Sequence, residues 1–163
     1  MPPDLEIRPI RPDEYDAVAD LNVRSYRPIY DDLGDYEAVL RRVAHRARAV
    51  DVLVARLDGQ LAGTVTYVPG PGPYAEGDDP DAAWIRMLAV EPGVERRGVG
   101  RALTVACIER ARAQGRARIL LNTGEPQVAA QRLYEGLGFH RLPELDEHVE
   151  DDFWLRAYGL ELA

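Results

Sequence analysis

Lysine is absent from this chain of 163 residues, and all 20 of its basic residues are arginine. The chain is also rich in Ala, Gly, Pro and Val, a composition typical of codon bias in a GC-rich genome. We therefore assign a function to an arginine only where it belongs to a motif. The 28 acidic residues give a net charge of −8, opposite to the balance expected of a protein that binds mainly nucleic acid. We expect no nucleic-acid partner.

Cysteine occurs once, as Cys107, which excludes an internal disulfide and a multi-cysteine metal site. We interpret Cys107 as a small core residue, since no partner base marks it as a nucleophile. His45, His140 and His148 lack the spacing of metal ligands, so no metal site is assigned. No apolar run could span a bilayer, and the first ten residues do not resemble a signal peptide. These absences predict a cytoplasmic protein with no membrane partner.

The length, with 46% hydrophobic and 29% charged residues, predicts one globular domain over residues 1–163. Alternation and β-branched runs predict strands at 5–10, 50–57, 61–68, 84–90, 119–122, 139–142 and 153–162. Helical spacing predicts helices at 13–25, capped by Asp13, at 36–48 and at 99–114. It predicts a last helix that begins at 126 or 127 and ends at 137. Asp58-Gly59 predicts a tight hairpin turn. We therefore expect a mixed α/β domain.

Two connecting segments are unusual. Residues 69–81 form a loop rich in Pro, Gly and Asp that is too long for a simple connection, so it is a candidate lid or substrate edge. Residues 144–152 form an acidic turn between the last two predicted strands. Both acidic segments would attract a cationic ligand.

The stretch from Leu88 to Arg101 combines a strand end, a glycine- and arginine-rich turn and the start of a helix. The first amides of a helix lack intrahelical partners, and the helix dipole places partial positive charge there. Glycines allow close approach of the backbone, and arginine stays charged near neutral pH. This order predicts a site for phosphate or pyrophosphate.

Two motifs in this element order resemble the GNAT-type N-acetyltransferase superfamily. The first is Gln/Arg-x-x-Gly-x-Gly/Ala between the fourth strand and the third helix, which reads Glu-Arg-Arg-Gly-Val-Gly at 95–100. The second is an Asn, an Ala-x-x-Leu-Tyr run and a closing Gly-Phe, which here reads Gln127, 130–134 and Gly138-Phe139. The resemblance covers residues 5–162. It implies a single-domain fold with a mixed, mostly antiparallel central sheet, a splay between the fourth and fifth strands, and helices on both faces.

The resemblance also implies acetyl-CoA as co-substrate. Its pyrophosphate would lie on the turn and the helix start, formed by Arg96, Arg97, Gly98, Val99, Gly100 and Arg101. Its pantetheine arm would run beside the backbone of Leu88, Ala89 and Val90, in a strand that often carries a bulge in this family. Asn122 would line the far wall, and Gln127 replaces the usual Asn.

Tyr134 is the catalytic candidate that the resemblance points to, because the matching tyrosine in the family protonates the departing thiolate. A phenol with a pKa of ~10 can donate to a thiolate whose conjugate acid lies near ~8.5. The alternative is a core tyrosine on an amphipathic helix.

Besides Gln127, two positions depart from the family pattern. Glu95 stands where Gln or Arg is usual, and we expect a modest loss of affinity unless it points away or pairs with Arg96 or Arg97. Trp84 stands about where relatives often have a Glu that acts as general base, and an indole cannot accept a proton. The substitutes are Glu76, Asp78, Asp79 and Asp81 in the preceding loop, or a held water.

The resemblance favours an N-acetyltransferase that moves an acetyl group to a primary amine by direct attack. The amine would belong to a small molecule or peptide and be cationic, and Tyr26, Tyr30 or Tyr74 would shape its pocket or pack in the core. One alternative is an acyl-CoA-binding sensor or interaction protein with little turnover. Another is a nucleotide-binding domain of a different type. A homodimer would fit the family.

Overall fold

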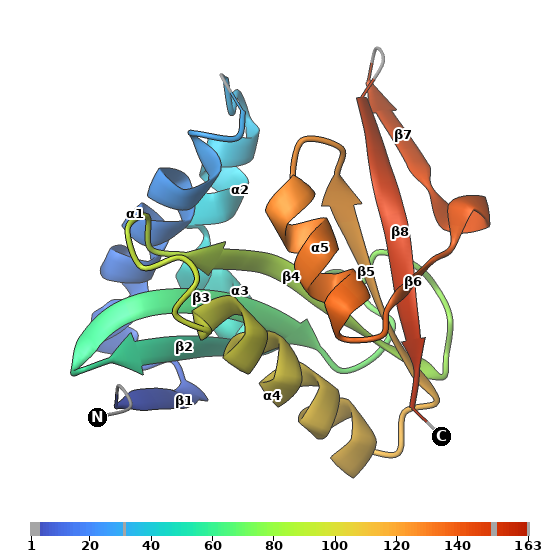
Figure 1. The fold of residues 1–163 in the computed structure, drawn as a ribbon, viewed down its shortest axis with the longest axis horizontal. Helices are drawn as coiled ribbons and strands as arrows, with labels where there is room; N and C mark the ends of the chain where they lie inside the picture. The colour runs from blue at the N-terminus through green and yellow to red at the C-terminus, as the bar shows by residue number, and fades with distance from the viewer. Residues whose placement is uncertain (1–3, 31, 151–152, 163) are drawn as a thin grey trace. The chain divides into compact units, whose positions relative to one another are not determined.

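The structure, a computed structural model, describes residues 4–30, 32–150 and 153–162 and divides into two compact units. The first unit comprises 1–67 and 87–107, and the second comprises 68–86 and 108–163. Strand β4 (Ala82–Val90) and helix α4 (Val99–Ala113) each contribute residues to both units (Figure 1). The single domain over 1–163 stays a prediction.

The first unit is built on a three-stranded antiparallel meander. Strand β2 (Asp51–Leu57) pairs on one side with β1 (Leu5–Pro9) and on the other with β3 (Gln60–Val68). The predicted hairpin turn between β2 and β3 is confirmed: Asp58 has φ 52° and Gly59 has φ 82°. Positive φ at both central residues suits the right-handed twist of the flanking strands.

Three helices precede β2 along the chain: α1 (Tyr15–Tyr26), α2 (Tyr36–Arg41) and α3 (Val43–Ala49). The predicted single helix over 36–48 is wrong, because the backbone leaves the helical region at Arg42, where ψ is 51°. The guanidinium of buried Arg46 donates to the carbonyl oxygens of Val39 at 2.5 Å and Leu40 at 3.0 Å. These bonds satisfy carbonyls at the end of α2 that have lost their helical partners.

The predicted Asp13 cap is also wrong, because a short 3-10 turn (Pro12–Glu14) precedes α1 and the N-cap position of α1 is occupied by Glu14. Its carboxylate accepts two hydrogen bonds of 2.8 Å from Arg8, one of 3.1 Å from Arg56 and one of 2.9 Å from the Arg11 amide. Hydrogen bonding from Arg8 is the largest of the effects that lower the pKa of Glu14 to about 2.

We expect Glu14→Gln to lower the free energy of unfolding by roughly 2 kcal/mol at pH 7, because the Gln side chain cannot pair with the two arginines. A carboxyl with a depressed folded-state pKa stabilises above its unfolded pKa. The difference between wild type and variant should therefore shrink as pH falls from ~4.5 toward ~2. Urea unfolding of both proteins at pH 7 and pH 3 measures this difference in the free energy of unfolding. Glu6→Gln, at an exposed partner of Arg8, is the matched control and should change stability little. An equal loss at both pH values would contradict the assignment.

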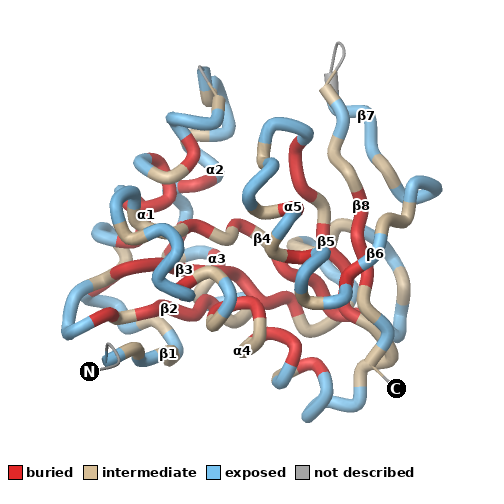
Figure 2. The backbone as a smooth tube through the Cα atoms, in the orientation of Figure 1, coloured by how far each residue is buried: buried red, intermediate tan, exposed pale blue. Residues whose placement is uncertain are grey.

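Helices cover both faces of this small sheet. Val54 of β2 packs with Val18 and Ala19 of α1 and Val43 of α3. On the opposite face, a Cβ at Gly63 of β3 would lie 2.8 Å from Val99 and 3.0 Å from Leu103 on α4. The buried stretches of β2 and β3 run between these layers (Figure 2). Cys107 on α4 is fully buried, which confirms it as a core residue.

Gly63→Ala should destabilise the protein by about 1–3 kcal/mol, because its Cβ would press α4 away from β3 or displace the Ala89 carbonyl oxygen, which lies 3.0 Å away. Gly136→Ala is the control: a Cβ there meets nothing within 4 Å, and alanine favours the helix. Denaturant unfolding should show loss in the first variant and none in the second. Equal stability of Gly63→Ala and wild type would contradict the close packing.

The second unit contains further strand pairs. The first residues of β4 pair in parallel with β5 (Arg118–Gly124), from Ala82–Arg118 to Ile85–Leu121. Strand β8 (Phe153–Glu161) lies antiparallel to β5, to β6 (His140–Arg141) and to β7 (Glu147–Glu150). Helix α5 (Val128–Gly136) connects β5 to β6. This mixed, mostly antiparallel arrangement confirms the predicted fold class.

The acidic segment 144–152 is more structured than predicted. A 3-10 turn (Pro143–Leu145) and strand β7 occupy much of it, and Asp151 and Asp152 lie outside the described residues. Asp146 anchors the segment by accepting hydrogen bonds of 2.7 and 2.6 Å from Arg141 and one of 2.8 Å from the Ala157 amide. The negative charge of Asp146, one of those predicted to attract a cationic ligand, is therefore already paired with Arg141.

Candidate active site

The turn that follows β4, residues 91–98, has a backbone shaped by positive φ angles. They occur at Gly93 (99°), Arg96 (69°) and Gly98 (82°), and α4 begins at Val99 immediately after. Glu91 fixes the start of the turn: its carboxylate accepts hydrogen bonds of 2.6 and 3.2 Å from Arg24 of α1. The turn and the start of α4 therefore lie where the sequence predicted them, and the pyrophosphate site stays a prediction.

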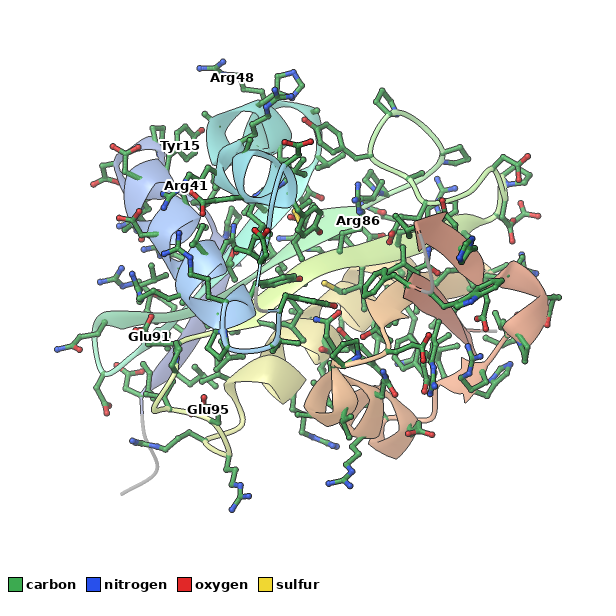
Figure 3. All side chains as sticks on the ribbon, turned by 90° about the horizontal axis from the view of Figure 1, so that it is seen from above. Tyr15, Arg41, Arg48, Arg86, Glu91 and Glu95 are labelled. Carbon is green, nitrogen blue, oxygen red and sulfur yellow. The ribbon has the colours of Figure 1, made fainter. Side chains whose placement is uncertain are left out.

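Glu95 does not pair with the neighbouring arginines. Its carboxylate accepts a hydrogen bond of 2.6 Å from the Gly93 amide, so it folds back into its own turn (Figure 3). Arg96, Arg97 and Arg101 are exposed, and no carboxylate of the described residues forms an ion pair with them. Their positive charges stay available to an anion at the N-terminus of α4.

Strand β4 changes conformation just before the residues predicted to accompany the pantetheine arm. Met87 has φ 54°, a left-handed conformation that is rare for a side chain without a polar group and interrupts a regular strand. The Glu91 amide then donates to the Ala62 carbonyl at 2.8 Å. β4 thus departs from regular strand geometry at Met87, and the bulge implied by the family resemblance stays a prediction.

Tyr26 and Tyr30 form an aromatic cluster in the first unit. Their rings stack with centroids 6.3 Å apart, and the Tyr26 ring lies 6.1 Å from that of Tyr36. Tyr26 is buried with Met87 and Ala89 of β4, and Tyr30 packs against the same cluster. Burial raises the pKa of the Tyr30 phenol to about 12. Core packing is thus observed for both, and the substrate role stays a prediction.

Tyr134 lies on α5 in the second unit and is 5% exposed. Its ring packs 5.6 Å from the ring of Phe139 and 6.5 Å from that of Tyr158. Gly138 adopts φ 98°, which lets the chain reverse so that the Phe139 amide donates to the Tyr134 carbonyl at 3.0 Å. The spacing from Tyr134 to the Gly-Phe pair therefore has a local structural cause.

Gln127 serves the turn between β5 and α5. Its side-chain oxygen accepts hydrogen bonds from the Gly124 amide at 2.9 Å and from the Thr123 hydroxyl at 3.3 Å. Buried Gln131 donates to the Gly124 carbonyl at 3.0 Å. The amide at position 127 thus orders the backbone here, and its predicted contact with the cofactor stays a prediction.

A cavity of about 160 Å³ lies in the second unit. Its lining residues are Glu76, Gly77, Asp78, Asp79, Trp84, Leu120, Leu121, Asn122, Leu145, Ala157 and Tyr158. Trp84 is 2% exposed, and its indole would meet a Cβ at Gly77 at 3.3 Å, so the loop 69–81 is packed onto it. The sequence identified Glu76 only as one of four acids in this loop, and no sequence signal distinguished it.

Glu76 extends from that loop into the cavity. Burial raises the pKa of its carboxyl, an effect opposed by the charge of Arg86 and by hydrogen bonds from the side chain and backbone of Asn122. Asn122, predicted to line the cofactor channel, is therefore engaged with a carboxylate in this structure.

Comparison with known proteins identifies the family. The model of the acetyltransferase (GNAT) family matches residues 15–139, which is more than half of the chain. The chain belongs to the GNAT acetyltransferase family. Both motifs quoted above, at 95–100 and 127–139, lie within the matched residues.

This GNAT chain is similar in sequence to larger enzymes. It is 30% identical over 125 residues to mycothiol acetyltransferase of Cellulomonas flavigena, an alignment covering 76% of this chain and 31% of that protein. Across eight such relatives the alignments cover between 17% and 39% of the relative's length. The chain therefore corresponds to one part of these proteins.

Solved structures share the fold of this GNAT chain. An acetyltransferase of the GNAT family from Staphylococcus aureus superposes with a TM-score of 0.76 at 16% identity, covering 98% of this chain and 100% of that one. The yncA structure from Salmonella typhimurium, described with its cofactor acetyl-CoA, gives a TM-score of 0.70 at 20% identity, covering 98% and 95%. These likenesses establish the fold.

No helix is long and apolar enough to cross a membrane in the part of the chain that the structure describes. Over the same residues, no group of three or more His, Cys, Asp or Glu side chains could hold a metal ion.

Proposed function

We propose that this chain is an N-acetyltransferase that moves an acetyl group from acetyl-CoA to a primary amine. The observation that carries the proposal is the turn 91–98 at the start of α4. There Gly98 supplies a positive φ, Arg96 and Arg97 are exposed, and Glu95 is turned back onto Gly93. Such a turn suits the pyrophosphate of coenzyme A, and it explains an arginine cluster within an acidic protein.

In this mechanism the neutral amine attacks the acetyl carbonyl carbon directly, without a covalent enzyme intermediate. A C–N bond forms, the C–S bond breaks, and the amine loses one proton. Coenzyme A supplies an acyl thioester, in which the thiolate is the leaving group. A strand amide near Leu88 stabilises the developing negative charge on oxygen, and Tyr134 protonates the departing sulfur.

We infer that the acceptor is a cationic primary amine of a small molecule or a peptide. The net charge of −8 and the acidic loop 69–81 favour attraction of a cation. The curated relatives named mycothiol acetyltransferase align with only part of their length, so their names support acetyl transfer without defining this acceptor. A cytoplasmic location and a homodimer are retained as predictions.

A second candidate function is an acyl-CoA-binding sensor with little turnover. Buried Trp84, at a position where the family often has a proton-accepting Glu, favours it. Under this alternative, acetyl-CoA binds and no amine is acetylated.

An acceptor screen separates the two functions. Thiol release from acetyl-CoA is measured over a panel of primary amines, with mass spectrometry to detect the acetylated product. Acetyl-CoA, ATP and NAD are compared by thermal shift, because a bound ligand raises the melting temperature. We expect stabilisation by acetyl-CoA and release of thiol with at least one amine. Stabilisation by acetyl-CoA without product from any amine would favour the sensor, and stabilisation by ATP or NAD instead would exclude both.

A further inference from the structure

The acetyl transfer proposed above requires a group that takes up a proton. A primary amine with a pKa of ~10 is an ammonium ion near neutral pH and cannot attack until it is deprotonated. Four acids of the loop 69–81 are candidates, and their surroundings differ. Asp79 pairs with Arg118 at 2.7 Å and accepts from the Asp81 amide at 2.9 Å. Asp78 and Asp81 are exposed.

Glu76, Asp78 and Asp79 all line the cavity, and Glu76 is the most enclosed of the three. Its side chain keeps 16% exposure, and its nearest cation is Arg86, whose Nε lies 3.6 Å from Oε1. Arg86 is committed elsewhere as well, because its Nη1 donates to the Tyr74 carbonyl at 3.0 Å (Figure 3). A carboxylate has about four acceptor positions. The contacts from Arg86 and Asn122 therefore leave the Glu76 carboxylate able to accept a hydrogen bond from a ligand.

The charged groups around Glu76 leave the cavity negative. Those facing it are Arg86 of β4, Asp78 and Asp79 of the loop, Glu147 of β7 and the phenol of Tyr158 of β8. Arg118 neutralises Asp79, and Asn122 contributes no charge. An ammonium group would thus find net attraction, with Glu76 as its most enclosed partner.

Part of the cavity wall is apolar. Trp84, Leu120, Leu121 and Ala157 line it, and Leu145 lies at a more exposed edge. The volume of about 160 Å³ is close to that of an apolar cavity of ~150 Å³ known to hold benzene. The space suits an amine with an apolar substituent the size of one ring, which would lie against the apolar part of the lining.

Tyr158 lies beside both the cavity and Tyr134, the residue proposed as the general acid. Tyr158 lines the cavity, and its ring centroid lies 6.5 Å from that of Tyr134. All of these residues belong to the second unit, so the arrangement is internal to it. Tyr158 therefore lines the same cavity as the proposed proton acceptor and packs beside the proposed proton donor.

We propose that Glu76 binds the acceptor ammonium and takes up its proton, and that the cavity around Glu76 receives an apolar substituent of the amine. This inference rests on the proposed acetyl transfer. Burial raises the pKa of the Glu76 carboxyl, and a base must be ionised to act. The rate should therefore fall with decreasing pH, starting above the range of an ordinary glutamate.

The test uses 2-phenylethylamine as probe, with methylamine and spermidine for comparison, and measures kcat/KM from pH 5 to 9. Glu76→Gln should lower kcat/KM for 2-phenylethylamine at least ~10²-fold and remove the acidic limb of the profile. Glu76→Asp should keep an acidic limb in its pH profile and have a higher kcat/KM than Glu76→Gln. Glu109→Gln makes the same chemical change on an exposed position of α4 and should stay within twofold of wild type.

Binding and folding are measured beside the rates. The Kd for acetyl-CoA and the Tm of Glu76→Gln should match those of wild type within experimental error. Ala157→Val, which narrows the cavity, should raise the KM for 2-phenylethylamine about tenfold and that for methylamine far less. This second variant keeps the inference testable if Glu76→Gln does not fold.

The outcomes distinguish the inference from the proposed function. If Glu76→Gln keeps more than a third of the wild-type kcat/KM with its acidic limb, the assignment of Glu76 is overturned and acetyl transfer stands. If spermidine is preferred to 2-phenylethylamine, the inference that the cavity receives an apolar substituent is overturned. If wild type acetylates no amine but binds 2-phenylethylamine, and Glu76→Gln does not bind it, the proposed function fails and the amine site remains.

Discussion

Tyr134→Phe is expected to lower kcat for amine acetylation about 10²-fold or more, because the thiolate would then leave without a proton donor. The Kd for acetyl-CoA should change little, since phenylalanine keeps the ring. That ring packs 5.6 Å from Phe139 and 6.5 Å from Tyr158, and the substitution preserves both contacts. Steady-state kinetics with the best amine from the acceptor screen, beside calorimetric titration of acetyl-CoA, separates the two effects.

Tyr67→Phe is the matched control for this experiment. Tyr67 is fully buried on β3, so its variant also removes one hydroxyl from the interior. Its kcat should remain close to that of wild type, even if stability falls by the ~1 kcal/mol of a lost hydrogen bond. Full activity in Tyr134→Phe would assign this tyrosine to the core and leave the thiolate to be protonated by solvent.

The second large effect is expected at Gly98, where alanine should weaken binding of acetyl-CoA about 5- to 30-fold. Gly98 has φ 82°, a conformation that costs a residue with a Cβ roughly 1–2 kcal/mol. A Cβ at this position meets nothing within 4 Å, so the cost is conformational and not a clash. The exposed turn would relax in the free protein, and binding would have to restore the strained geometry. Calorimetric titration of acetyl-CoA measures the change.

Gly115→Ala gives the comparison that this result needs. Gly115 follows α4 with φ 71° and likewise has open space around it. Alanine there carries a similar backbone cost and lies outside the turn 91–98, so stability should fall while the Kd for acetyl-CoA is unchanged. Equal affinities of Gly98→Ala and wild type would show that the turn does not form the pyrophosphate site.

Much of the local structure of this protein follows from its sequence alone. Asp58-Gly59 determines a hairpin, since both residues tolerate positive φ. The motif at 95–100 determines where α4 begins, and Gly138-Phe139 determines how α5 ends. Each of these features depends on neighbours a few residues apart. Because the family motifs also depend on neighbours a few residues apart, the family could be recognised from the sequence.

The tertiary structure decided what depends on partners distant in the sequence. The pattern of residues 36–48 suits one helix, yet the chain breaks at Arg42, where the buried guanidinium of Arg46 bonds the freed carbonyls. Glu76, Asp78, Asp79 and Asp81 look alike in a sequence, because burial and pairing leave no trace in residue type. Only the fold encloses Glu76 while pairing Asp79 with Arg118, since desolvation and ion pairing depend on distance in space.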